Sequence, residues 1–149
     1  MAKVVDIKYL DERCRLKKGS PGAFAYDIRA RLEAPVTIEQ GKSVMIPTGV
    51  HVDSKEATLG VFMMIRSGMA AKHGLTLLNA VGLIDSDYRG EIMACVYNTG
   101  AAGKDYVVEP FERLGQVMFM RAEDVELNEV DKLSNSERGE GGFGSTGTV

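Results

Sequence analysis

Short apolar runs alternate along the chain with clusters of Gly, Pro, Asn and Asp, and this spacing dominates the pattern. The runs are "VVDIKYL", "YDIRA", "VTIEQG", "SVMIPTGVHVD", "GVFMMI", "LTLLN", "VGLID", "EIMACVYN", "DYVVEP" and "GQVMFMRA". Brief β-rich runs bounded by turn residues predict strands. Helical periodicity is nearly absent, so the pattern favours an all-β sandwich or barrel.

One segment departs from this pattern. In "RSGMAAKHG", Ser67 has the chemistry of an N-cap and Gly74 that of a residue that ends a helix. The segment therefore predicts a helix of about one and a half turns.

The composition changes near residue 122. The stretch "AEDVELNEVDKLSNSERGEGGFGSTGTV" is acidic, then rich in Ser and Asn, then rich in Gly. We expect a β-rich core over 1–121 and an extended arm over 122–149 within a single domain. The end of the arm fits the G-x-G-x-x-G pattern by letter, but a dinucleotide loop needs a strand before it and a helix after it. A disordered tail and a ligand-binding lid both remain open from this composition.

Charge and cysteine usage narrow the function classes. The formal net charge of −3 argues against non-specific nucleic-acid binding, so an anionic ligand would depend on a few local arginines. No apolar stretch approaches the ~20 residues that span a membrane, and the N-terminal residues do not resemble a signal peptide. Cys14 and Cys95 match no metal spacing, and the apolar run around Cys95 predicts a reduced, buried thiol. These features predict a cytoplasmic protein with no membrane partner.

The segment "NAVGLIDSDYRGE" carries the first candidate chemistry. Asn79 and Gly82 indicate a hairpin or sharp bend. Asp85 and Asp87 would share one face if they lay on a strand, and a carboxylate beside an apolar strand suits a general base for water. Turn positions for both aspartates are the alternative, because turns are the commoner use of Asp.

Two further segments carry charge in informative places. Asp27 lies inside the apolar run "AYDIRA" and requires a partner or a metal, for which Arg113 is a candidate, with Gln116 nearby in sequence. Arg66 and Ser67 precede the predicted helix, whose first N–H groups favour phosphate. The alternative is a plain cap at Ser67 beside a solvated Arg66.

Taken in order, "AYDIRA", "RSGMAAKHG", "GLIDSDYRGE", "ERLGQVMF" and "RGEGGFGSTG" closely resemble the five motifs of the trimeric dUTPases, over about residues 25–147. The resemblance implies a distorted jelly roll that assembles as a homotrimer with active sites between subunits. It also implies Mg²⁺-assisted hydrolysis of dUTP to dUMP and pyrophosphate, which keeps uracil out of DNA and supplies dUMP for dTMP synthesis.

The resemblance assigns roles to individual residues. Asp85 would activate the water that attacks the α-phosphorus, and Tyr88 would pack under the deoxyribose and exclude a 2′-hydroxyl. The uracil pocket would be formed by Asn79, Gly82, Leu83, Ile84 and Met93. The phosphates would be held by Arg66, Ser67, Gly68 and Gln116, with Asp27 meeting Mg²⁺ through water. In the arm, Arg138 would contact the γ-phosphate, Phe143 would cover the uracil, and Gly144, Ser145 and Thr146 would wrap the phosphates.

Two other functions remain as alternatives. A dCTP deaminase shares the fold, but those enzymes resemble this segment with a catalytic glutamate at the position of Cys95. A regulatory module that senses dUTP by binding it is the second alternative, although a pure binding protein has no need of the carboxylate of Asp85.

Overall fold

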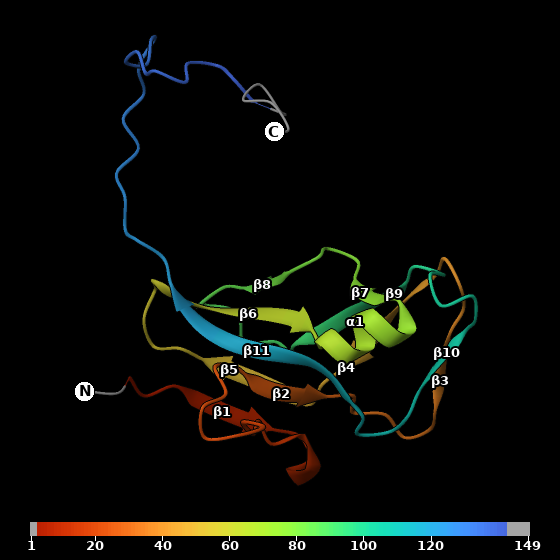
Figure 1. The fold of residues 1–149 in the computed structure, drawn as a ribbon. Helices are drawn as coiled ribbons and strands as arrows, with labels where there is room; N and C mark the ends of the chain where they lie inside the picture. The colour runs from red at the N-terminus through yellow and green to blue at the C-terminus, as the bar shows by residue number, and fades with distance from the viewer. Residues whose placement is uncertain (1–2, 143–149) are drawn as a thin grey trace.

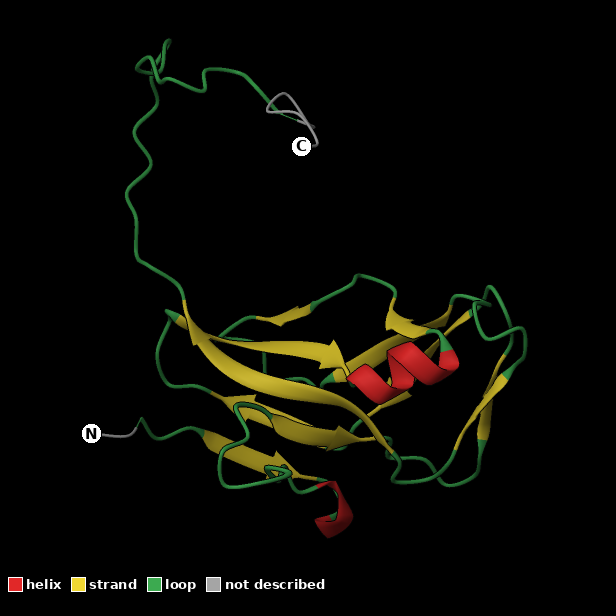
Figure 2. Cartoon of the chain, in the orientation of Figure 1, coloured by secondary structure: helices red, strands yellow, loops and turns green. Residues whose placement is uncertain are grey.

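A computed structural model of the chain describes residues 3–142, and it is built almost entirely of β-strands (Figures 1 and 2). The strands are β1 (Asp6–Tyr9), β2 (Tyr26–Arg29), β3 (Val36–Ile38), β4 (Ser43–Pro47), β5 (Val50–Asp53), β6 (Leu59–Ile65), β7 (Leu75–Leu77), β8 (Gly82–Ile84), β9 (Met93–Asn98), β10 (Tyr106–Val108) and β11 (Arg113–Arg121). A 3₁₀ turn, η1 (Glu12–Cys14), and one helix, α1 (Ser67–His73), complete the elements of the described chain.

The strands form four antiparallel sheets rather than one closed barrel across the described residues. The largest has the order β2-β11-β6-β8, a second has the order β4-β9-β7, and β1-β5 and β10-β3 are pairs. Ile28, Val61, Val96, Leu114 and Val117, from strands of both larger sheets, are buried in a common core. The expected all-β, distorted jelly-roll fold is thus confirmed.

The run "SVMIPTGVHVD" forms two strands where the sequence pattern predicts one. Gly49, between β4 and β5, has a φ of +70°, in the left-handed region that favours glycine. A Cβ at this position would also lie 2.7 Å from Cys14 Sγ. The hydroxyl of Thr48 donates to the carbonyl of Ile92 at 2.6 Å, which fixes the break in the strand beside the residue that precedes β9.

The predicted helix is present, but the prediction that Ser67 caps it is wrong. Arg66 is the N-cap residue, without a side-chain capping bond, and Ser67 is the first helical residue. The carbonyl of Arg66 accepts from the N–H groups of Met69 and Ala70 at 3.0 and 3.1 Å, so the backbone alone closes the first turn. Gly74 ends the helix with a φ of +66°, as predicted.

The last strand ends at Arg121, and residues 122–140 that follow are exposed. Figure 1 shows this segment (blue) leaving the end of β11 and running away from the sheets. The predictions for Phe143, Gly144, Ser145 and Thr146 lie outside the described residues. Between residues 3 and 142, no helix is both long and apolar enough to cross a membrane.

Candidate active site

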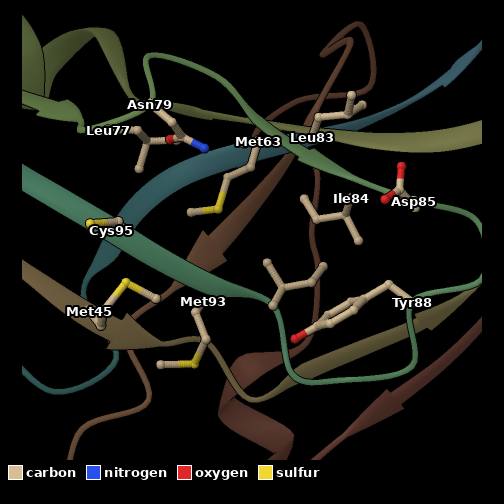
Figure 3. Close-up of a pocket in the computed structure, with 12 residues that line it drawn as sticks. Met45, Met63, Leu77, Asn79, Leu83, Ile84, Asp85, Tyr88, Met93 and Cys95 are labelled. Atoms are coloured by element: carbon tan, nitrogen blue, oxygen red, sulfur yellow. The ribbon is translucent and has the colours of Figure 1, made fainter.

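A cleft of about 330 Å³ opens between β8 and β9 (Figure 3). Its lining includes seven residues that the sequence singles out for the nucleotide: Asn79, Gly82, Leu83, Ile84, Asp85, Tyr88 and Met93. Asn79 lies toward one end of the cleft, and Asp85 and Tyr88 lie toward the other. The cleft thus has an amide at one end, a carboxylate at the other, and an apolar middle.

A sharp bend before β8 sets the position of Asn79. Ala80 N–H donates to the carbonyl of Leu77 at 2.9 Å, and Val81 N–H donates to the carbonyl of Asn79 at 2.7 Å. The strand then pairs with β6, with Gly82 opposite Met63. A Cβ on Gly82 would lie 3.3 Å from the Cβ of Met63, so glycine permits this close approach.

The turn after β8 presents Asp85 and Tyr88. Tyr88 N–H donates to the carbonyl of Asp85 at 3.2 Å, and the Tyr88 hydroxyl donates to the carbonyl of Glu91 at 3.0 Å. Asp85 and Asp87 both lie beyond the end of the strand, so the expectation of a shared strand face is wrong. Of the two, Asp85 is the one that lines the cleft.

The wall of the cleft contains sulfur-bearing residues that the sequence interpretation missed. Met45, Met63 and Cys95 line it together with Met93. The prediction of a buried Cys95 is wrong: this thiol is partly exposed, and Cys14 is the fully buried one. The spacing of two between Met93 and Cys95 on β9 was a usable signal, because such residues share a strand face. Met45 is opposite Cys95 in the β4–β9 ladder, which no local pattern reveals.

Glu91 links the turn that carries Tyr88 to the segment between β4 and β5. Its Oε1 accepts from Gly49 N–H at 2.6 Å and from Arg31 Nε at 3.2 Å. Burial by itself raises the pKa of the Glu91 carboxyl, but the hydrogen bonds from Arg31 and Gly49 outweigh burial, and the pKa lies below its ordinary value. Glu91 is therefore ionised at neutral pH, and its backbone carbonyl holds the Tyr88 hydroxyl.

A second polar group forms around Asp27, which is 7% exposed. Arg113 Nη1 donates to Asp27 Oδ2 at 3.1 Å, as the sequence predicts, and Arg66 Nε lies 3.5 Å from Asp27 Oδ1. Gln116 is directly opposite Asp27 in the β2–β11 ladder. Gly115, beside it, has no room for a side chain, because a Cβ would lie 2.7 Å from the carbonyl oxygen of Met64. Two guanidinium groups and a carboxylate thus gather where β2, β11 and the end of β6 lie side by side, with Gln116 paired opposite Asp27.

Within one chain, the structure divides the sequence-predicted residues into separate groups. The lining of the cleft includes Asp85 and Tyr88 but not Asp27, Arg66, Ser67, Gly68 or Gln116. In the arm, Arg138 is exposed, and its Nε donates to the carbonyl of Gly141 at 2.8 Å. In a single chain, Asp27 and its arginine partners therefore do not line the same cleft as Asp85 and Tyr88.

The described carboxylates suit a metal ion that is held mainly by the phosphates of a bound nucleotide and only in part by the protein. Among residues 3–142, no three His, Cys, Asp or Glu side chains gather into a metal site. Magnesium usually keeps several waters and needs only one or two carboxylates when phosphates supply other oxygens. Asp27 fits this limited role, because each carboxylate oxygen has lone pairs beyond those directed at Arg66 and Arg113.

Similarity to known proteins identifies the family of this chain. A dUTPase family profile matches residues 13–147. The chain is 43% identical over 148 residues to the deoxyuridine 5′-triphosphate nucleotidohydrolase of Herminiimonas arsenicoxydans, covering 97% of this chain and 98% of that protein. It is 42% identical over 146 residues to the protein of the same name from Burkholderia ambifaria strain MC40-6, covering 96% and 97%.

Solved structures show the same fold. The dUTPase from Streptococcus mutans has a TM-score of 0.71 and 29% identity, over 82% of this chain and 98% of that one. The Staphylococcus bacteriophage 80alpha dUTPase with dUpNHpp has a TM-score of 0.86 and 24% identity, over 99% and 100%. Fold and sequence together define an enzyme of the all-β, jelly-roll type. More narrowly, the chain belongs to the dUTPase family, which confirms the family and enzyme class that the motifs predict.

Proposed function

We propose that the protein hydrolyses dUTP to dUMP and pyrophosphate. The observation that carries the proposal is the cleft in which Asn79, Tyr88 and Asp85 line one pocket from β8 and its two flanking turns. Each of the three suits one part of a deoxyuridine nucleotide. The names of the relatives and the ligand of the phage 80alpha structure support the same substrate.

Base recognition belongs to the Asn79 end of the cleft. Its amide offers both a donor and an acceptor, which matches the alternating groups on the uracil edge. The backbone of Gly82, Leu83 and Ile84 would add further groups, and Met63, which lies close to Gly82 and lines the cleft, would narrow the pocket beside the base. Met93 contributes apolar contact. A tight pocket of this kind disfavours the larger base of dTTP.

Sugar recognition and water activation belong to the other end. The Tyr88 ring would pack under the deoxyribose and leave no space for a 2′-hydroxyl. The carboxylate of Asp85 would hold the attacking water and accept its proton as the bond to the α-phosphorus forms. A positioned base of this kind contributes about 10²- to 10⁴-fold to a rate.

The phosphates require cationic groups, and the described residues that line the cleft of one chain include no Lys or Arg. Arg66, Ser67, Gly68 and Gln116 would bind them, and Asp27 would meet Mg²⁺ through water. When bound, Mg²⁺ would neutralise charge that develops on the departing pyrophosphate. Because Asp27 and Asp85 line no common cleft in the single chain, we propose that neighbouring subunits of a homotrimer combine the two groups.

The arm would complete the site as a lid. Arg138 would contact the γ-phosphate, with Phe143 over the uracil and Gly144, Ser145 and Thr146 around the phosphates. Ordering this glycine-rich segment costs on the order of 1 kcal/mol per residue, so closure requires contacts that only the bound nucleotide supplies. A cytoplasmic location stays a prediction from the sequence.

One residue argues against the first alternative, and turnover distinguishes the second. Deamination of dCTP requires a carboxylate in the cleft wall where Cys95 lies, and a thiol does not replace it. A dUTP sensor would bind the same nucleotide without turnover.

A substrate panel tests the proposal. Purified protein with Mg²⁺ should release pyrophosphate from dUTP but not from dCTP, dTTP or UTP. Asp85→Asn should lose about 10²-fold or more in kcat while still binding dUTP. Asp87→Asn, two residues further in the same turn, is the matched control and should keep its activity. Ammonia from dCTP, or binding of dUTP without pyrophosphate release, would contradict the proposal.

A further inference from the structure

Arg89 follows the turn that presents Asp85 and Tyr88, and its side chain folds back over that turn. Its Nη1 donates to the carbonyl of Ser86 at 2.7 Å and to the carbonyl of Tyr88 at 3.3 Å. Hydrogen bonds from a charged donor are stronger than neutral ones. The guanidinium thus holds together the peptide groups on both sides of Asp87.

A different part of the fold anchors this arginine. Arg89 Nη2 donates to Asp53 Oδ1 at 2.9 Å, and the Nδ1–H of His51 donates to the carbonyl of Arg89 at 3.0 Å. His51 and Asp53 are two residues apart on β5, so both side chains lie on one face of that strand. We refer to His51, Asp53 and Arg89 as the β5 clamp.

The N-terminal ladder fixes the position of the β5 clamp. In the β1–β5 pair, His51 is opposite Lys8 and Asp53 is opposite Asp6. Asp53 Oδ1 also accepts from the N–H of Lys55 at 3.0 Å, which orients the carboxylate toward Arg89. These contacts connect a strand outside the cleft to the turn that forms one end of it.

The energetics indicate a role in positioning rather than in stability. The side chains of Arg89 and Asp53 are 54% and 38% exposed, and exposed ion pairs contribute little to folding. The geometry of the turn has a larger effect on chemistry, because a misplacement of about 1 Å in a catalytic group can cost 10²-fold in rate. The carbonyls of Ser86 and Tyr88 that Arg89 holds belong to the same turn as Asp85 and Tyr88, so their release would act on both residues.

We infer that Arg89, held by Asp53 and His51, is a positioning residue that sets the geometry of Asp85 and Tyr88. The inference rests on the proposed function of those two residues. It predicts that loss of the β5 clamp reduces both water activation and the preference for deoxyribose, without contact between Arg89 and the substrate.

The kinetic test compares Arg89→Met with Arg15→Met. Arg15 is a matched control, because it is 55% exposed and pairs with the carboxylate of Glu12 on another surface. Arg89→Met should lower kcat for dUTP by about tenfold to a hundredfold and narrow the kcat/KM ratio of dUTP over UTP. Arg89→Lys should restore little, because one ammonium group does not reproduce the forked donation to two carbonyls and a carboxylate. A melting temperature close to wild type for Arg89→Met excludes a general folding defect.

A second measurement needs no turnover. The N–H of Tyr88 donates to the carbonyl of Asp85 within the turn, so its hydrogen exchange reports on the turn itself. Exchange should accelerate about tenfold or more in Arg89→Met, because the variant loses the charge-assisted hydrogen bonds to the carbonyls of Ser86 and Tyr88. It should stay unchanged in Arg15→Met.

The outcomes separate the two proposals. Unchanged kinetics and unchanged exchange in Arg89→Met would overturn the β5 clamp. Faster exchange in a protein that never hydrolyses dUTP would instead contradict the proposed function alone. If Arg89→Met fails to fold, Asp53→Asn removes the charged anchor and leaves the arginine in place. Asp53→Asn should also impair the kinetics with dUTP and accelerate exchange of the Tyr88 N–H, both by smaller factors than Arg89→Met. Wild-type kinetics together with wild-type exchange would overturn the inference.

Discussion

Replacement of Gly90 by alanine offers a test in which one added methyl group acts on one side chain. A Cβ on Gly90 would lie 2.2 Å from Tyr88 Oη and 2.4 Å from Tyr88 Cζ. Ordinary contact begins at 3.4 Å, so the ring must move away. Gly90 is not among the described glycines with positive φ, so its backbone accepts alanine without strain.

The effect of Gly90→Ala on stability is expected to be small. Tyr88 is 45% exposed and has room to swing outward. The move breaks the hydrogen bond from the Tyr88 hydroxyl to the carbonyl of Glu91, which costs about 0.5–1.5 kcal/mol. Replacing glycine by alanine at an unstrained position regains about 0.4–1 kcal/mol through the unfolded chain. The net change should therefore stay within about 1 kcal/mol, or a few degrees in Tm.

The effect on function should be much larger, because the displaced ring no longer packs under the sugar. We expect the kcat/KM ratio of dUTP over UTP to narrow by about tenfold or more. Steady-state pyrophosphate release with both nucleotides measures the ratio, and thermal unfolding measures stability. Gly22→Ala is the control, because a Cβ there meets nothing within 4 Å. A wild-type ratio in Gly90→Ala would refute the placement of Tyr88 under the sugar.

Three further predictions concern Glu91, the two thiols and the arm. The pKa of Glu91 is lowered in the folded state, so this residue stabilises the fold above its ordinary value of 4.5 and loses that effect as the pH falls through the folded value. Glu91→Gln should therefore show a smaller drop in melting temperature between pH 7 and pH ~3.5 than wild type, and an equal drop would count against the ion pair. Burial raises the pKa of the Cys14 thiol, so a thiol reagent should modify Cys95 before Cys14. Bound dUTP should slow the modification of Cys95. Equal modification of Cys95 with and without dUTP would contradict binding of the base in the cleft. Truncation before Arg138 should leave the melting temperature unchanged and nearly abolish turnover, whereas full turnover would refute the lid.

Local sequence rules predict most of the fold because strand periodicity and turn residues act over short distances. Each apolar run contains a strand, and Gly74 ends the helix where its left-handed conformation allows. These local rules fail where a contact between residues distant in sequence determines the bounds of an element. Gly49 divides one run into β4 and β5 against Cys14, and the backbone of Arg66, not the side chain of Ser67, closes the first helical turn.

The candidate site is likewise predicted in part by local sequence and set in part by contacts between distant residues. The order of motifs indicates Asp27, Asn79, Asp85 and Tyr88 from the sequence, although their roles stay predictions. The apolar wall of the cleft depends on strand pairing, so no local pattern places Met45 opposite Cys95. The ion pair of Arg66 with Asp27 and that of Arg89 with Asp53 also connect residues far apart in the chain. Only the folded structure brings these residues together.

The most direct test of the account is hydrolysis of dUTP in ¹⁸O-labelled water, with mass analysis of both products. Attack by a water held at Asp85 on the α-phosphorus places the label in dUMP and leaves pyrophosphate unlabelled. Label in pyrophosphate would mean attack at a different phosphorus, and no cleavage of dUTP at all would contradict the proposed function.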